Sequence, residues 1–131
     1  QSTISRSLHM RYLSPILIVL PTLLFLLIGL RWLIEPAAVA PEFGFDLGQG
    51  LGRSTQVANI ASFFLTGSLC GITALISQNR TWLVPTMMLC MIAALGRTLA
   101  WLVHDASFAT AQIAVELIIT SMLLIAYRRM K

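Results

Sequence analysis

Residues 82–127 read WLVPTMMLCMIAALGRTLAWLVHDASFATAQIAVELIITSMLLIAY, and this stretch decides the fold of the chain. It contains two apolar runs, 82–103 and 108–127. Each run has about the twenty residues that a helix needs to cross a bilayer. Because only the short turn 104–107 separates the runs, the stretch predicts an antiparallel pair of membrane-spanning helices.

One ionisable residue lies inside each of these runs, Arg97 in the first and Glu116 in the second. A helix rises about 1.5 Å per residue, and counting from His104 and Phe108 places both residues roughly 10–12 Å inside the same membrane face. Charges in hydrocarbon are costly, and they persist where they pair, line a water path or bind something. We interpret the two residues first as a structural ion pair. The alternatives are a polar pocket, with Glu116 as a proton or cation site and Arg97 as an anion anchor, or contact with another protein.

Other polar residues of the same membrane half could join such a pocket. Asn59 lies in the outer part of the second apolar run, and Gln112 lies at a similar depth on the fourth. His104 and Asp105 stand at the expected outer mouth. The alternative role for each is an interhelical hydrogen bond, which contributes about 0.6 kcal/mol on average in membrane proteins.

Two further apolar runs extend the hairpin to an all-α integral membrane protein, an antiparallel bundle of four transmembrane helices. We expect these spans at 13–34 and 57–76, and a single membrane domain over residues 1–131. The composition agrees, because 57% of the residues are hydrophobic and 11% are charged. Soluble domains carry about 25% charged residues. The net charge of +4 does not predict nucleic-acid binding, since the basic residues stand at segment ends.

The segment 35–54 between the first two spans is rich in Pro and Gly and predicts an outer loop. Its alternating glycines, 48–52, do not follow a strand, which argues against a phosphate-binding loop. A flexible or partly helical cap on the membrane surface fits this composition better. We expect Ser54 or Thr55 to cap the second span, and Thr81 to cap the third.

The distribution of basic residues predicts that both termini are cytoplasmic. Six basic residues fall on the expected inner side: Arg6, Arg11, Arg80, Arg128, Arg129 and Lys131. The outer side has two, Arg31 and Arg53, and these are offset by acids: Glu35, Glu42, Asp46 and Asp105.

The histidines and cysteines do not form a cofactor motif. Cys70 and Cys90 lie singly in apolar runs, which predicts packing residues rather than a disulfide or a zinc site. His9 and His104 fall on opposite sides of the predicted membrane, which disfavours a haem with two histidine ligands. We therefore expect no cofactor and no metal.

Small residues recur at helical spacing in two spans. Gly67 and Gly71 stand four apart in the second span, and Gly96 and Ala100 stand four apart in the third. Such pairs let helices approach closely, either within a bundle or between protomers.

The chain resembles an uncharacterised bacterial family of small four-span membrane proteins that is distantly similar to DoxX-like proteins. The resemblance rests on Gly29-Leu30-x-x-Leu33-Ile34-x-Pro36, Phe43-Gly44, Leu95-Gly96-Arg97, Asp105 and Glu116. The chain departs from the family pattern at 56–62, where an acidic-x-Arg element and paired glycines are expected, and at Ala106, where glycine is expected. The resemblance implies a four-span fold in a bacterial inner membrane and a role for Arg97 and Glu116.

Two classes of function fit these observations. The first is a non-enzymatic accessory or structural subunit that packs against lipids and against other membrane proteins or further copies of itself. The second is a binder, carrier or enzyme for a lipophilic small molecule that uses Arg97 and Glu116.

Overall fold

The computed structural model describes the backbone of residues 2–131 and the side chains from Ser14 onward. This part of the chain is all helical and contains no strand. The side chain of His9 therefore lies outside the described residues, as do those of Arg6 and Arg11. In chain order the elements are α1 (Ser2–Ile34), α2 (Pro36–Val39), the 3₁₀ helix η1 (Ala40–Phe43), α3 (Leu51–Ser77), the 3₁₀ helix η2 (Arg80–Trp82), α4 (Leu83–Val103) and α5 (Thr110–Arg129).

Four helical segments are long and apolar enough to cross a membrane, which confirms the number of apolar helices that the sequence predicts. They are Ser14–Ile34, Leu51–Ser77, Arg80–Val103 and Thr110–Arg129.

The helix boundaries agree with the first predicted span and correct two predicted caps. The apolar span Ser14–Ile34 agrees with the predicted span at 13–34, and it belongs to a longer helix that begins at Ser2. Ser54 and Thr55 do not cap α3, because the N-cap position is occupied by Gly50. The φ of Gly50 is +56°, a conformation that glycine adopts readily. Thr81 is not a cap either. Its N–H donates to the side-chain oxygen of Asn79, which opens η2.

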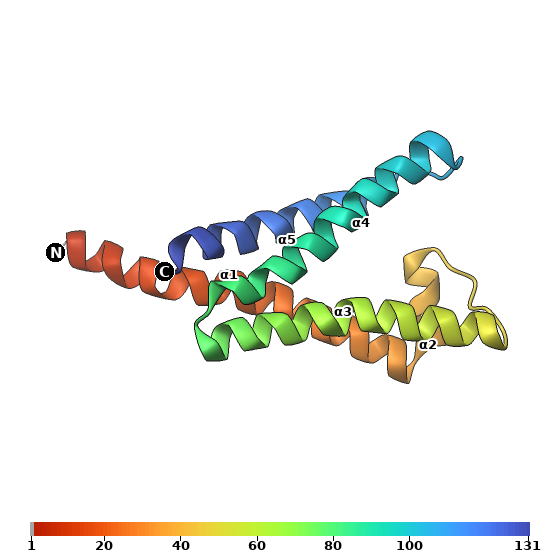
Figure 1. Ribbon diagram of the computed structural model, residues 1–131, viewed down its shortest axis with the longest axis horizontal. Helices are drawn as coiled ribbons and strands as arrows, with labels where there is room; N and C mark the ends of the chain where they lie inside the picture. The colour runs from red at the N-terminus through yellow and green to blue at the C-terminus, as the bar shows by residue number, and fades with distance from the viewer. Residues whose placement is uncertain (1) are drawn as a thin grey trace.

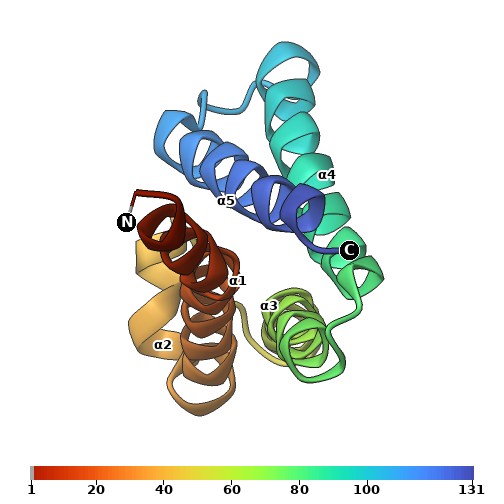
Figure 2. The ribbon, with the colours of Figure 1, turned by 90° about the vertical axis from the view of Figure 1, so that its left-hand side faces the viewer.

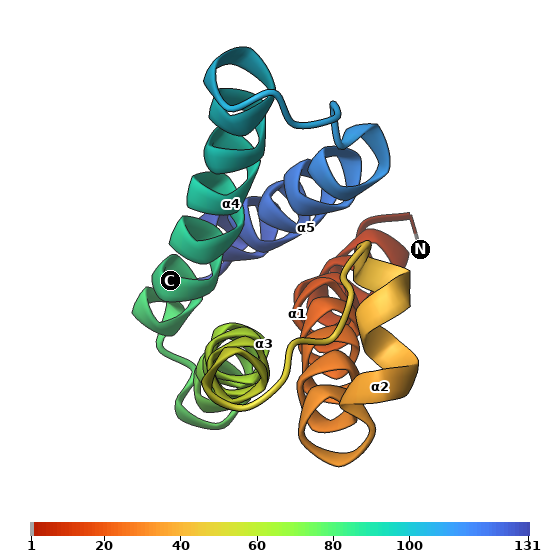
Figure 3. The ribbon, with the colours of Figure 1, turned by 90° about the vertical axis from the view of Figure 1, so that its right-hand side faces the viewer.

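The four long helices form two antiparallel pairs (Figure 1). Viewed from the end that holds the chain termini, α1 lies beside α3 and α5, and α4 lies beside the same two helices (Figure 2). The α1–α3 pair and the α4–α5 hairpin lie close together at this end, and they diverge toward the opposite end (Figures 1 and 3). We call these the closed end and the open end of the bundle.

Glycines set the close packing of the α1–α3 pair. A Cβ atom on Gly67 would lie 2.5 Å from Cδ2 of Phe25, and one on Gly71 would overlap the Thr22 side chain. Gly67 and Gly71 therefore serve packing within the bundle, one of the two roles that their spacing predicts. Gly96 differs, because no described atom outside its own stretch of helix lies within 4 Å of the position that its Cβ would take.

Residues 35–50, which we call the cap, cover the open end of the α1–α3 pair. Arg31 ties the cap to α1: its Nη1 and Nη2 donate to both carboxylate oxygens of Glu42, at 2.8 and 3.0 Å, and its Nε donates to Glu35 at 3.0 Å. Trp32 is fully buried beneath the cap, edge-on to Phe43. The indole N–H of Trp32 has no acceptor among the described residues, so packing alone holds the ring. The loop predicted over 35–54 is thus partly helical, and it ends at Gly50 rather than at residue 54.

Arg80 and Thr86 hold the closed end of the bundle together. Nη1 of Arg80 lies 3.4 Å from the carbonyl oxygen of Tyr127 and 3.2 Å from that of Met130, and the guanidinium lies over the Tyr127 ring. A cation is well placed there, because the last carbonyls of a helix lack intrahelical partners. Thr86 Oγ1 donates to the carbonyl oxygen of Gly67 at 3.0 Å and joins α4 to α3.

Candidate functional site

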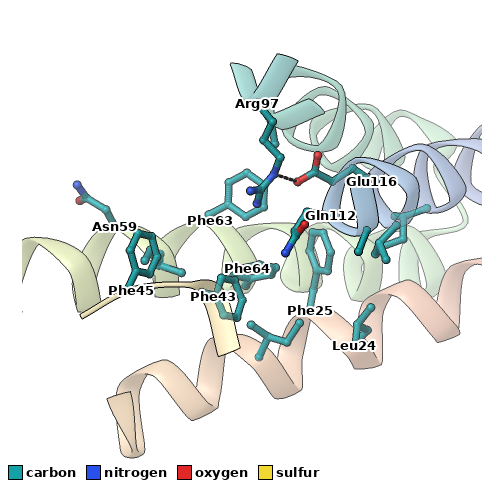
Figure 4. Close-up of a pocket in the computed structure, with 16 residues that line it drawn as sticks. Leu24, Phe25, Phe43, Phe45, Asn59, Phe63, Phe64, Arg97, Gln112 and Glu116 are labelled. Carbon is teal, nitrogen blue, oxygen red and sulfur yellow. Dashed lines mark hydrogen bonds and ion pairs between the residues drawn. The ribbon is translucent and has the colours of Figure 1, made fainter. Parts of the chain in front are cut away.

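A cavity of about 490 Å³ lies between the α1–α3 pair and the α4–α5 hairpin, on the open side of their contact. We call it the cleft. All four long helices and the cap contribute to its lining, which is mostly hydrocarbon and phenyl groups (Figure 4). Four polar side chains also line it: Asn59, Arg97, Gln112 and Glu116.

Arg97 and Glu116 form the charged part of the cleft. Nε of Arg97 on α4 lies 2.7 Å from Oε1 of Glu116 on α5. The contact agrees with the matching depth that the hairpin spacing predicts. The Glu116 side chain is 13% exposed and that of Arg97 is 38% exposed, so the carboxylate is the more deeply buried partner.

The ion pair leaves hydrogen-bonding capacity unused. A guanidinium has five N–H donors, and only Nε of Arg97 meets an acceptor among the described side chains and backbone. The second carboxylate oxygen of Glu116, Oε2, is buried and has no partner within the same part of the chain. A buried acceptor without a donor costs about 1–3 kcal/mol, so this end of the cleft is a polar centre that the protein satisfies only in part.

Gln112 and Asn59 bring amide groups to the same cavity. Gln112 lies one helical turn before Glu116 on α5, and its side chain projects into the space between α3 and the α4–α5 hairpin (Figure 4). Asn59 lines the cleft from α3, near the cap. Both residues are exposed, and neither amide has a hydrogen-bond partner in the described residues.

His104 and Asp105 do not line the cleft, which corrects the prediction that they stand at its mouth. Both are exposed and belong to the turn that ends α4. Asp105 adopts a left-handed backbone conformation with φ of 55°, and the N–H of Ala106 donates to the carbonyl oxygen of Ala100. The divergence of the two helix pairs carries this turn away from the α1–α3 pair (Figure 3).

Five phenylalanines make an aromatic wall opposite the ion pair: Phe25, Phe43, Phe45, Phe63 and Phe64. Their rings pack edge-on or tilted, with centroids 5.0 Å apart for Phe25–Phe64 and 5.8 Å apart for Phe43–Phe64. Such geometries are the favourable ones for aromatic pairs. The wall joins side chains from α1, α3 and the cap, so the cap is part of the site.

No protein-family model, no curated protein and no solved structure matches this chain. The resemblance to the small four-span bacterial family therefore stays a prediction.

The sequence reasoning missed the aromatic wall. The sequence does contain a cluster of phenylalanines: Phe43 and Phe45 lie two positions apart in the loop, and Phe63 and Phe64 are adjacent in the second span. Their convergence requires the cap to fold back over α3, which the linear pattern does not show.

The cysteines and His104 do not line the cleft. Cys70 and Cys90 are both buried and both free. Cys90 belongs to the apolar core at the closed end. Among the described side chains, no group of three or more His, Cys, Asp or Glu residues is placed to hold a metal ion.

Proposed function

We propose that this chain is a multi-pass integral membrane protein that binds a lipophilic small molecule in the cleft. The observation that carries the proposal is the cleft itself. Its volume of about 490 Å³ falls within the range of about 300–1,000 Å³ that is typical of small-molecule sites. Such sites combine apolar walls with a few placed polar groups, and the aromatic wall with Arg97, Glu116 and Gln112 has this composition.

The distribution of charge supports a membrane orientation with both termini in the cytoplasm. Basic residues lie at the closed end of the bundle: Arg80, Arg128, Arg129 and Lys131. Acidic residues lie in the cap and the α4–α5 turn: Glu35, Glu42, Asp46 and Asp105. Basic residues mark the cytoplasmic side of membrane proteins. In this orientation the cleft opens in the outer half of the membrane, and the resemblance described above favours a bacterial inner membrane.

The rim of the cleft supports entry from the bilayer rather than from water. Leu24 of α1 is 40% exposed and Val115 of α5 is 46% exposed, and both also line the cleft. In a membrane these rim side chains face lipid. A molecule dissolved in the bilayer would therefore meet a continuous hydrocarbon surface from the lipid into the cleft.

A photoactivatable alkane tests this function without assuming any headgroup. Proteoliposomes receive a hexadecane chain with a diazirine at its middle, and labelled peptides are mapped by mass spectrometry after irradiation. We expect saturable labelling of residues 59–64 and 111–119. The variant Ala111→Trp, which fills the cleft, should weaken this labelling by about tenfold, equivalent to 1.4 kcal/mol.

The matched control is Ala114→Trp. Ala114 is exposed on the same helix, as Ala111 is, but it does not line the cleft, so its labelling should equal that of the wild type. Labelling that spreads evenly over all lipid-facing surfaces, without saturation and without a difference between the two variants, would refute the proposal.

A second candidate is an accessory subunit of a larger membrane complex. One observation favours it: the position of a Cβ on Gly96 is surrounded by open space, and Ala100 lies one turn further along α4. This leaves a strip of small residues that another membrane helix could approach. Native mass spectrometry of protein from its own membrane separates the candidates. A stoichiometric assembly supports the subunit, whereas a monomer that carries a small adduct supports ligand binding.

A further inference from the structure

We infer that the molecule in the cleft is an uncharged amphiphile, whose single polar group accepts hydrogen bonds from Arg97. The inference rests on the proposed function and names the class of ligand that the same site takes. It follows from the charge balance of the lining and from the donors that the ion pair leaves free.

The charge balance of the cleft excludes a charged headgroup. Among the residues that line it, only Arg97 and Glu116 carry formal charges, +1 and −1, which sum to zero. Their contact at 2.7 Å already gives each charge its partner. An ionised headgroup would therefore enter an apolar, lipid-facing cavity without a counter-charge, which is costly at membrane depth.

The free donors of the cleft define the chemistry of the polar group. Nη1 and Nη2 of Arg97 have no acceptor among the described residues, and the guanidinium lies in the space between α4 and the aromatic wall (Figure 4). The Gln112 amide projects toward the same space. A carbonyl or hydroxyl oxygen can accept from these N–H groups and leave the Arg97–Glu116 contact intact.

The aromatic wall receives the rest of the ligand. Phe25, Phe63 and Phe64 lie across the cavity from the ion pair and present ring faces and edges. A hydrocarbon body laid along them removes apolar surface from contact with any water in the cleft. One polar group at the Arg97 end and an apolar body over the phenyl rings therefore match the two halves of the cavity.

The test compares four photoactivatable probes that share a sixteen-carbon chain with a mid-chain diazirine. One has no headgroup, and the others end in a primary amide, a carboxylate or an ammonium group. In wild-type proteoliposomes at pH 7, we expect the amide to reach half-maximal labelling of 111–119 at about one-tenth the concentration of each other probe, a difference of 1.4 kcal/mol. The alkane lacks the hydrogen bonds, and the ionised probes lack a counter-charge.

Two reciprocal variants make the charge argument specific. Glu116→Gln leaves Arg97 without its partner, so the carboxylate probe should become the best ligand. Arg97→Gln leaves Glu116 without its partner, so the ammonium probe should gain over the carboxylate. If one variant fails to fold, only the result for that variant is lost, because the four probes are also compared in the wild-type protein.

The outcomes separate the two claims. Saturable cleft labelling by the alkane, with the carboxylate or ammonium as the preferred probe of the wild type, overturns the uncharged headgroup but leaves the proposed function standing. Equal labelling by the amide and the alkane overturns the role of Arg97 as a donor. Failure of every probe to label the cleft saturably overturns the proposed function, and the headgroup inference falls with it.

Discussion

The Arg97–Glu116 pair gives the sharpest test of how the bundle tolerates charge. The perturbation is a double-mutant cycle made of Arg97→Met, Glu116→Leu and the two together. Each single variant removes one charge and leaves the other in the cleft without its partner. The double variant leaves two apolar side chains of similar length at the same position.

The structure sets the expected magnitudes. Breaking a fully buried pair costs about 3–5 kcal/mol, but the side chains here are 38% and 13% exposed, which lowers the figure. We expect Arg97→Met to cost about 2–3 kcal/mol of unfolding free energy, because the stranded carboxylate is the more buried group. Glu116→Leu should cost about 1–2 kcal/mol, because the longer arginine can extend its charge toward water.

The double variant should lose no more than about 1 kcal/mol, because apolar residues often replace buried ion pairs at little cost. The coupling energy is then about 3 kcal/mol, at the upper end for residues in contact. The unfolding free energies of the wild type and the three variants can be measured in lipid bicelles by steric trapping. Photolabelling by the amide probe on the same samples shows whether a folded double variant has lost its ligand, which would separate a binding site from a structural pair. Arg97→Met with wild-type stability and wild-type labelling would refute both accounts of the pair.

Three further predictions concern the scaffold around the cleft. Gly67→Ala and Gly96→Ala both gain about 0.5–1 kcal/mol of helix propensity. Only the first meets a neighbour, so the unfolding free energy of Gly67→Ala should be about 1–3 kcal/mol lower than that of Gly96→Ala, and equal values would contradict the packing described. In the cap, the hydrogen bond from Arg31 lowers the pKa of Glu42. The ionised Glu42 therefore stabilises the cap at neutral pH, and this stabilisation is lost as the pH falls below about 4.5 and through the lowered pKa. Emission from Trp32, which is buried beneath the cap, should report this loss, and Glu42→Gln should abolish the acid response. At the closed end, Arg80→Gln should speed amide hydrogen exchange in the last turn of α5 but not in its first turn, and uniform exchange along the helix would count against the clamp.

The fold was largely predictable because long apolar runs are strong signals. A run of twenty apolar residues allows few arrangements other than a spanning helix, and the turns that flank the third run are short. The start of α3 was less predictable. The segment 51–56 is polar, yet Gln56 binds the N–H of Gly48 at 2.7 Å and Arg53 binds its carbonyl oxygen at 2.9 Å, which holds the cap against the first turns of the helix. These contacts reach back across the loop, and the local pattern does not show them.

The heights of the site residues along their helices could be predicted from the sequence, but the shape of the cleft could not. The spacing of Arg97 and Glu116 about a short turn fixes their relative height, and the structure brings them into contact. The same count placed His104 and Asp105 near the pocket, because residue number gives height along a helix but not the angle between helix pairs. That angle follows from packing: glycines draw α1 and α3 together, while no such contact draws the α4–α5 hairpin onto them at the open end.

The position of the ion pair also bears on how the cleft opens. Arg97 and Glu116 both belong to the α4–α5 hairpin, so their contact stiffens that hairpin and does not tie it to the α1–α3 pair. Among the described side chains, the polar link between the two units is the bond from Thr86 of α4 to Gly67 of α3, and at the closed end Arg80 of the connecting η2 bonds to the end of α5. The hairpin is thus held at one end and bordered by phenyl rings at the other. A ligand that bonds to Arg97 and lies on those rings would supply a link across the open end, and binding should therefore narrow the range of angles between the two helix pairs.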